Sequence, residues 1–106
     1  MKIPPYIFVG GHIIDVELVK TDRCKDFGVF DHWYRKIKIN IDDTKEDVQA
    51  EAFLHEIVEA INTIYELDLD HKTLNILSEV LFQIIRRNGL DFRDPIYPLK
   101  TALKVS

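Results

Sequence analysis

The sequence has little cysteine and no long apolar run. Its 106 residues include one cysteine, Cys24, so no internal disulfide can form. The N-terminal stretch Met-Lys-Ile-Pro-Pro lacks the apolar core of a secretory signal. No apolar run approaches the roughly 20 residues that cross a bilayer. We therefore expect a cytoplasmic protein that does not enter a membrane.

The sequence also lacks a net positive charge and has little glycine. Lys and Arg number 14 against 18 Asp and Glu, for a net charge of -4. No basic surface is therefore expected for a nucleic-acid backbone. The pair Gly10-Gly11, half of the four glycines, is typical of a tight hairpin turn and not of a phosphate-binding loop. These scarcities argue against nucleic-acid binding and against a glycine-rich nucleotide site.

The remaining composition is that of an ordinary globular protein, with 46% apolar and 30% charged residues. This length suits one core, so we expect residues 1–106 to form a single domain. Residues 6–41 are rich in β-branched and aromatic residues, which predicts strands near 6–9, 13–19, 28–32 and 36–41. In the last of these, Ile37, Ile39 and Ile41 alternate with polar residues and indicate one buried face.

Two helices are expected after the sheet. The first should span about 44–67, with Asp43 or Thr44 as its N-cap. The second should span about 71–88, from the N-cap Asp70 to the stop Asn88-Gly89, and leave an irregular tail over 89–106. The expected fold class is α+β, in which an N-terminal antiparallel β-meander of three to four strands packs on a two-helix hairpin.

The first expected helix contains His55-Glu56-x-x-Glu59, a variant of the zinc-peptidase motif HExxH. Residues four apart lie on one side of a helix, so His55 and Glu59 present an imidazole and a carboxylate to the same point. Both can bind zinc, and two histidines with one glutamate form a known catalytic ligand set. Glu56, beside the first ligand, suits a general base that takes a proton from water. We therefore expect Zn²⁺ as the cofactor and Glu56 as the catalytic residue.

A third metal ligand could come from His71 or Glu79 on the second helix. His71 lies about 95° from the centre of the apolar stripe of that helix, on the flank of its buried face. Glu79 lies about 175° away and is expected to point to solvent. His71 is therefore the favoured third ligand beside His55 and Glu59.

A simpler interpretation is that the motif lies on a solvated helix face. His55 and Glu59 lie about 140° and 180° from the centre of the apolar face, where an amphipathic helix shows polar residues to water. His12 and His32, next to a turn and a strand end, are expected to be surface residues and not ligands.

The order of these features resembles the small zincin-like, gluzincin-type metallopeptidase domains of phages and prophages, which are related to the ImmA/IrrE-type peptidases. The resemblance covers about residues 6–90. It rests on the glycine hairpin, on Gly28-Val29-Phe30-Asp31 ahead of Lys36-Ile37-Lys38-Ile39, on Phe53-Leu54-His55-Glu56, and on Leu67-Asp68-Leu69-Asp70 ahead of a helix that ends at Arg87-Asn88-Gly89.

This resemblance implies a zincin-like fold in which His55 binds the metal and Glu56 is the catalytic base. The sequence departs from the family at two positions. Glu59 stands where the family has its second histidine, and His71 stands near the place of an acidic ligand. The exchange keeps two histidines and one carboxylate.

Two functions are compatible with these residues. One is a zinc-dependent metallopeptidase that hydrolyses bonds of a peptide or protein substrate through a metal-activated water. The other is a catalytically inactive pseudo-peptidase that binds a protein partner, with Ile96, Tyr97 and Leu99 of the tail as a docking segment. A metal with a purely structural role is a third possibility.

Overall fold

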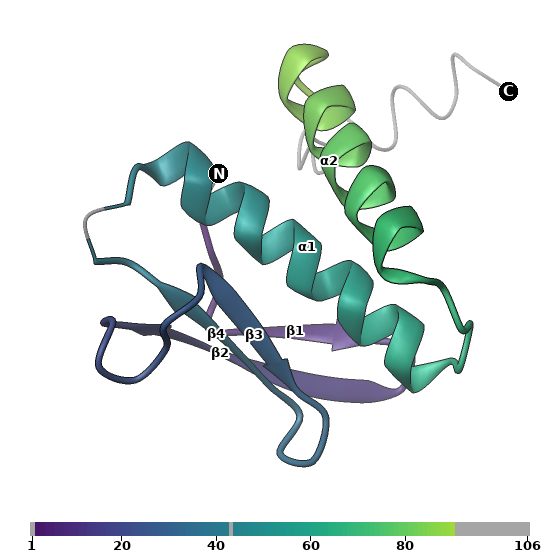
Figure 1. The fold of residues 1–106 in the computed structure, drawn as a ribbon, viewed down its shortest axis with the longest axis horizontal. Coiled ribbons are helices and arrows are strands. Elements are labelled where there is room, and N and C mark those ends of the chain that lie inside the picture. The colour runs from purple at the N-terminus through teal and green to yellow at the C-terminus, as the bar shows by residue number, and fades with distance from the viewer. Residues whose placement is uncertain (1, 43, 91–106) are drawn as a thin grey trace, which may run out of the picture.

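A computed structural model describes residues 2–42 and 44–90, which form an α+β fold (Figure 1). The α+β class predicted from the sequence is confirmed. The tail residues Ile96, Tyr97 and Leu99 lie outside the described residues. The described elements, in chain order, are β1 (Tyr6–Val9), β2 (His12–Val19), β3 (Gly28–Asp31), β4 (Lys36–Asn40), α1 (Glu46–Ile64) and α2 (His71–Arg87).

The sheet is mixed, so the predicted antiparallel meander is wrong. Its strand order is β1-β2-β4-β3, and β2 pairs with β4 in parallel while the other two pairs are antiparallel. Both β2 and β4 carry fully buried isoleucines, Ile14 on β2 and Ile37 and Ile39 on β4, which suits them to the centre of the sheet. Alternation in a sequence shows which face of a strand is buried, but it does not name the neighbouring strand. The chain between β2 and β4 forms the crossover, and it leaves β3 at the edge.

The core lies between the sheet and α1. Ile14, Val16, Ile37 and Ile39 from the central strands are buried with Phe53 of α1. Ile41, predicted to continue the buried stripe of β4, is instead exposed, because the strand ends at Asn40.

Asn40 is buried and fixes the end of β4. Its Nδ2 donates to the carbonyl oxygen of Cys24 at 2.8 Å, and its Oδ1 accepts from the backbone N–H of Asp42 at 2.8 Å. The chain therefore leaves the sheet at this residue.

The first helix is shorter than predicted. It begins at Glu46, and its N-cap position is occupied by Lys45 without a side-chain cap bond. The predicted cap Thr44 instead donates its hydroxyl to the carbonyl oxygen of Asn40 at 3.2 Å, whereas Asp43 lies outside the described residues. The predicted end at residue 67 is also wrong: the helix stops at Ile64, and positive φ angles of 52° at Glu66 and 57° at Asp68 follow.

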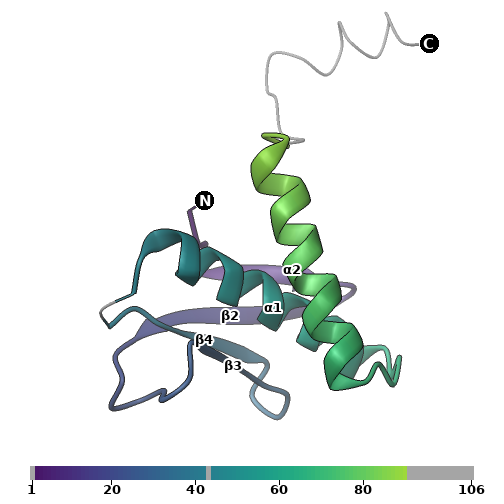
Figure 2. The ribbon, with the colours of Figure 1, turned by 45° about the horizontal axis from the view of Figure 1, so that its top comes forward.

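The predicted fold has both helices packed on the sheet as one hairpin. In the structure α1 packs on the sheet, whereas α2 packs on α1. α1 contacts β3 and β4, while α2 contacts α1 and rises away from the sheet (Figure 2). The predicted N-cap of α2 is confirmed, because Asp70 Oδ1 accepts from the backbone N–H of Thr73 at 2.7 Å. Neither described helix is long and apolar enough to span a membrane.

Candidate functional site

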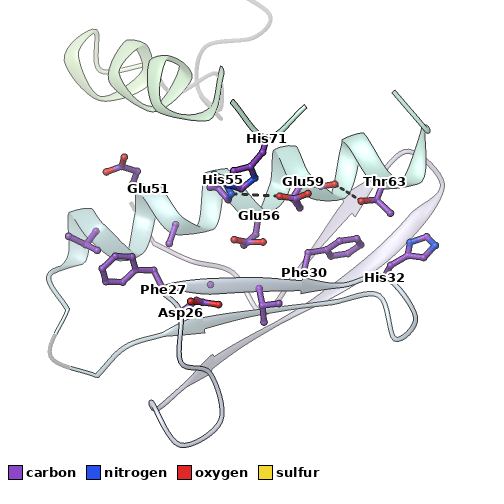
Figure 3. A pocket seen from close by; sticks show the side chains of 14 residues that line it. Asp26, Phe27, Phe30, His32, Glu51, His55, Glu56, Glu59, Thr63 and His71 are labelled. Atoms are coloured by element: carbon purple, nitrogen blue, oxygen red, sulfur yellow. Dashed lines mark hydrogen bonds and ion pairs between the residues drawn. The ribbon is translucent and has the colours of Figure 1, made fainter. Parts of the chain in front are cut away.

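A pocket of about 890 Å³ lies between α1, the edge strand β3 and the start of α2 (Figure 3). It gathers the residues that the sequence singled out from both helices, together with residues of β3. The residues that line it are Asp26, Phe27, Gly28, Val29, Phe30, His32, Val48, Glu51, Ala52, His55, Glu56, Glu59, Thr63 and His71.

The lining of this pocket is strongly acidic. Four carboxylates, from Asp26, Glu51, Glu56 and Glu59, share it with three imidazoles. Among the described residues that line it there is no Lys or Arg. Charge of one sign in a cleft raises the local concentration of the opposite ion, so the pocket favours a cation over an anionic ligand.

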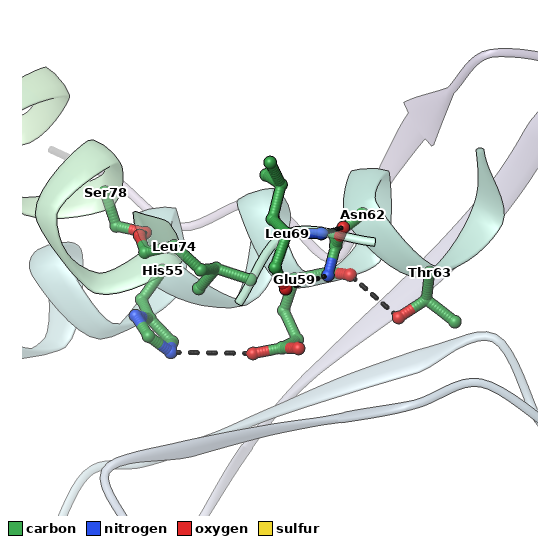
Figure 4. Close-up of polar contacts among 7 residues, drawn as sticks. All are labelled: His55, Glu59, Asn62, Thr63, Leu69, Leu74 and Ser78. Carbon is green, nitrogen blue, oxygen red and sulfur yellow. Dashed lines mark hydrogen bonds and ion pairs between the residues drawn. The ribbon is translucent and has the colours of Figure 1, made fainter. Parts of the chain in front are cut away.

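His55 and Glu59 point to the same part of the pocket, as the one-turn spacing on α1 predicted. His55 Nε2 lies 3.7 Å from Glu59 Oε2 (Figure 4), and the two side chains are 27% and 34% exposed. The hydroxyl of Thr63, which also lines the pocket, donates to the backbone oxygen of Glu59 at 2.9 Å. This face of α1 is therefore not the fully solvated face of the simpler interpretation.

Glu56 is buried under α1 and points towards β3 (Figure 3). Burial, and to a smaller extent the nearby carboxylates of Glu59 and Asp26, raise the pKa of its carboxyl from 4.5 to about 7, while the backbone N–H of Phe30 acts in the opposite direction. Near neutral pH the protonated and the ionised forms are therefore both populated. A group that both holds and releases a proton in this range is suited to general acid–base chemistry.

The connection between the helices brings His71 to the pocket. Asn62 on α1 accepts from the backbone N–H of Leu69 at 2.9 Å and donates to the carbonyl oxygen of Leu69 at 3.5 Å. Two residues further on, His71 opens α2 and lines the same pocket as His55. Glu79, the alternative third ligand, is exposed on α2 and does not line it.

The His55–Glu59 pair fits the donor separation of a zinc site. Two ligands held at about 2.0 to 2.2 Å in a tetrahedral arrangement lie about 3.4 Å apart, close to the 3.7 Å between His55 Nε2 and Glu59 Oε2. Within residues 2–42 and 44–90, no three His, Cys, Asp or Glu side chains form a group that could hold a metal. His71 thus shares the pocket wall with the pair without completing a three-donor group.

Most of the residues that line the pocket were not predicted as part of the site, among them Asp26, Gly28 and His32. Gly28 opens β3 and Asp26 lies two residues before it, and only the folding of β3 beside α1 brings them to the pocket that Glu56 lines. No local pattern around Asp26 signals this, while Gly28 belongs to the Gly-x-Phe-Asp stretch of the family resemblance. His32 is exposed, as predicted, yet it also lines the pocket, whereas His12 is exposed and lies outside it.

Comparisons of the chain with protein-family models, with curated proteins and with solved structures found no match.

Proposed function

We propose that this protein is a zinc-dependent metallopeptidase of the zincin-like, phage and prophage type. His55, Glu59 and His71 would hold the metal, and Glu56 would act as the general base. The observation that carries the proposal is the placement of His55 and Glu59, 3.7 Å apart, beside a buried Glu56 whose pKa is about 7. The zincin-like assignment itself rests on the resemblance of residues 6–90.

Each part of the pocket has a task in this proposal. Zinc, when bound, supplies a Lewis acid and lowers the pKa of a water molecule. Glu56 would take up a proton from the attacking water and donate one to the leaving amine, and both transfers require a pKa near the working pH. Phe27 and Val29 give the pocket apolar walls against which the side chains of a peptide can pack.

Zinc binding by the protein tests the ligand assignment. The protein is purified without chelator for elemental analysis, then stripped of metal and titrated with ZnCl₂ by calorimetry. We expect one tight site in the wild type. The variants His55→Ala, Glu59→Gln and His71→Ala should each lose more than the roughly 10- to 100-fold in affinity that an outer-shell substitution costs. His12→Ala is the matched histidine control and should bind zinc as the wild type does. Glu79→Ala removes the alternative third ligand and should also keep the wild-type affinity.

Hydrolysis tests the base. With fluorescein-labelled casein and saturating zinc, Glu56→Gln should lose about 10²- to 10⁴-fold in rate, the usual contribution of a general base, while its zinc affinity stays. Two outcomes contradict the proposal: zinc that binds the wild type no better than His55→Ala, or a Glu56→Gln variant that cleaves casein at the wild-type rate.

A second candidate function is that of a catalytically inactive, peptide-binding relative of such peptidases. It is favoured by one observation, that the described residues hold a donor pair and no complete three-donor group. In that case the wild type and His55→Ala would bind zinc equally weakly, and neither would cleave casein. Binding of intact casein to the wild type, lost on Phe27→Ser at the exposed wall of the pocket, would then support the second candidate.

A further inference from the structure

Gly28 on β3 lies directly under the carboxyl group of Glu56. A Cβ atom at residue 28 would stand 3.1 Å from Glu56 Cγ and 3.4 Å from Glu56 Oε2, and 3.0 Å from Ile39 Cδ1. The positive φ angles among the glycines belong to Gly10 and Gly89, so the backbone of Gly28 does not itself require glycine. Glycine is instead required by the small space between this residue and the side chains of Glu56 and Ile39.

The free edge of β3 also presents backbone N–H groups near Glu56. The backbone N–H of Asn40 donates to the carbonyl oxygen of Phe27 at 2.9 Å, which places the β4-facing backbone groups at Phe27 and, two residues on, at Val29. Gly28 and Phe30 therefore turn their backbone N–H groups to the free edge of the sheet. The backbone N–H of Phe30 favours the ionised form of the Glu56 carboxyl and so lowers its pKa, against the effect of burial.

We propose that Gly28 is a positioning residue, whose missing side chain leaves a seat in which the Glu56 side chain lies. The catalytic meaning of the seat rests on the proposed function, but the seat itself needs no metal. A side chain at residue 28 would push Glu56 Cγ away by a few tenths of an ångström and carry the carboxyl with it. Since a misplacement of about 1 Å can cost about 100-fold in rate, this smaller shift should cost less than that.

The alternative reason for glycine at this position is packing against Ile39. The Ile39 contact involves Cδ1, the free end of a side chain, which can turn away from a new methyl group. The Glu56 contact involves Cγ, in the middle of the side chain, and this atom cannot move without carrying the carboxyl with it. The two explanations therefore make different predictions. If Glu56 is the reason for glycine, the loss of stability caused by a side chain at residue 28 depends on the presence of Glu56.

The first arm of the test measures activity on labelled casein with saturating zinc. Gly28→Ala should lower kcat at least about 10-fold and leave the zinc affinity unchanged, because the metal ligands stay in place. Gly11→Ala is the matched control, since a Cβ at that glycine meets no atom within 4 Å. Its kcat should stay at the wild-type value. A Gly28→Ala enzyme with wild-type kcat overturns the proposal.

The second arm needs no activity and measures urea unfolding of the metal-free protein. Gly28→Ala should lower the unfolding midpoint in the wild-type background and leave it nearly unchanged in a Glu56→Ala background, where the seat is empty. If Gly28→Ala alone does not fold, a folded Gly28→Ala/Glu56→Ala double variant supports the seat. Equal loss in both backgrounds, or a double variant that is also unfolded, overturns it. If the wild type cleaves no casein, the proposed function fails and this arm alone decides the seat.

Discussion

At the residue scale, Glu56 combines burial with two nearby carboxylates. The side chain is 7% exposed and faces Asp26 and Glu59 in a pocket to which no described lysine or arginine contributes. Burial and like charge both disfavour its ionised form, and the backbone N–H of Phe30 only partly offsets them. Because the pKa of this carboxyl group differs between the folded and the unfolded chain, the stability of the fold depends on pH.

We expect the free energy of unfolding of the metal-free protein to fall as the pH rises between 4.5 and about 7. Folding raises the pKa of Glu56 from 4.5 to about 7, so in this window the folded chain keeps a proton that the unfolded chain has released. The contribution is full below 4.5 and lost above about 7, and it amounts to on the order of 2 to 3 kcal/mol. Urea unfolding at pH 4.5 and pH 8 measures it.

The uncharged isostere Glu56→Gln removes this dependence. It should exceed the wild type in stability at pH 8 and approach it at pH 4.5. Glu51→Gln, an exposed residue of the same pocket and helix, is the control and should keep the wild-type slope. A Glu56→Gln variant with the same slope as the wild type would refute the assignment of the proton to Glu56.

At the element scale, α2 is held to the rest of the molecule mainly by its first half. The sequence predicts an apolar stripe along this helix, yet Leu74 is 1% exposed while Leu77 and Ile84 are 42% and 44% exposed. The reason is that α2 crosses α1 near its own start and then rises away (Figure 2). A 3.6-residue period identifies the apolar side of a helix, but not how much of its length finds a neighbour.

Leu74→Ala should therefore cost about 2 to 5 kcal/mol in the free energy of unfolding, the range for an emptied core position. Leu77→Ala, one turn along the same helix and already part exposed, should cost less than about 1 kcal/mol. Urea unfolding compares the two. Because Leu74 anchors the turn that carries His71, the zinc affinity should also fall in Leu74→Ala and not in Leu77→Ala. Equal costs for the two variants would mean that α2 is not anchored at Leu74.

At the scale of the whole molecule, the sequence predicts the elements well and their arrangement less well. Within residues 2–42 and 44–90, alternation and helical periodicity predicted each strand and helix to within a few residues, and the spacing of His55 and Glu59 predicted that they meet. The order β1-β2-β4-β3 could not be predicted, because it depends on which strands compete for the centre of the sheet. Asp26 and Gly28 join Glu56 only through that order, since it places β3 at the edge beside α1.

The same arrangement links zinc binding to the stability of the whole fold. His55 and Glu59 belong to α1, which packs on the sheet, and His71 belongs to α2, so a metal held by all three would tie the two helices together. A ligand that binds only the folded state at 100 times its Kd adds about 2.7 kcal/mol of stability. For a domain of this size, that corresponds to a rise in Tm of roughly 10 to 20 °C. Calorimetric scans with ZnCl₂ and with chelator measure this rise.

Variants separate a catalytic metal from a purely structural one. His55→Ala should lose the zinc-dependent rise in Tm, and His12→Ala should keep it, because His12 lies outside the pocket. Glu56→Gln should keep the rise and lose the hydrolysis of casein, since it removes the base and leaves the ligands. A purely structural metal would also raise the Tm of the wild type. In that case any casein hydrolysis by the wild type would survive chelation. A catalytic metal therefore gives two results together. Hydrolysis is lost both on chelation and in Glu56→Gln, and the rise in Tm is lost in His55→Ala but kept in Glu56→Gln.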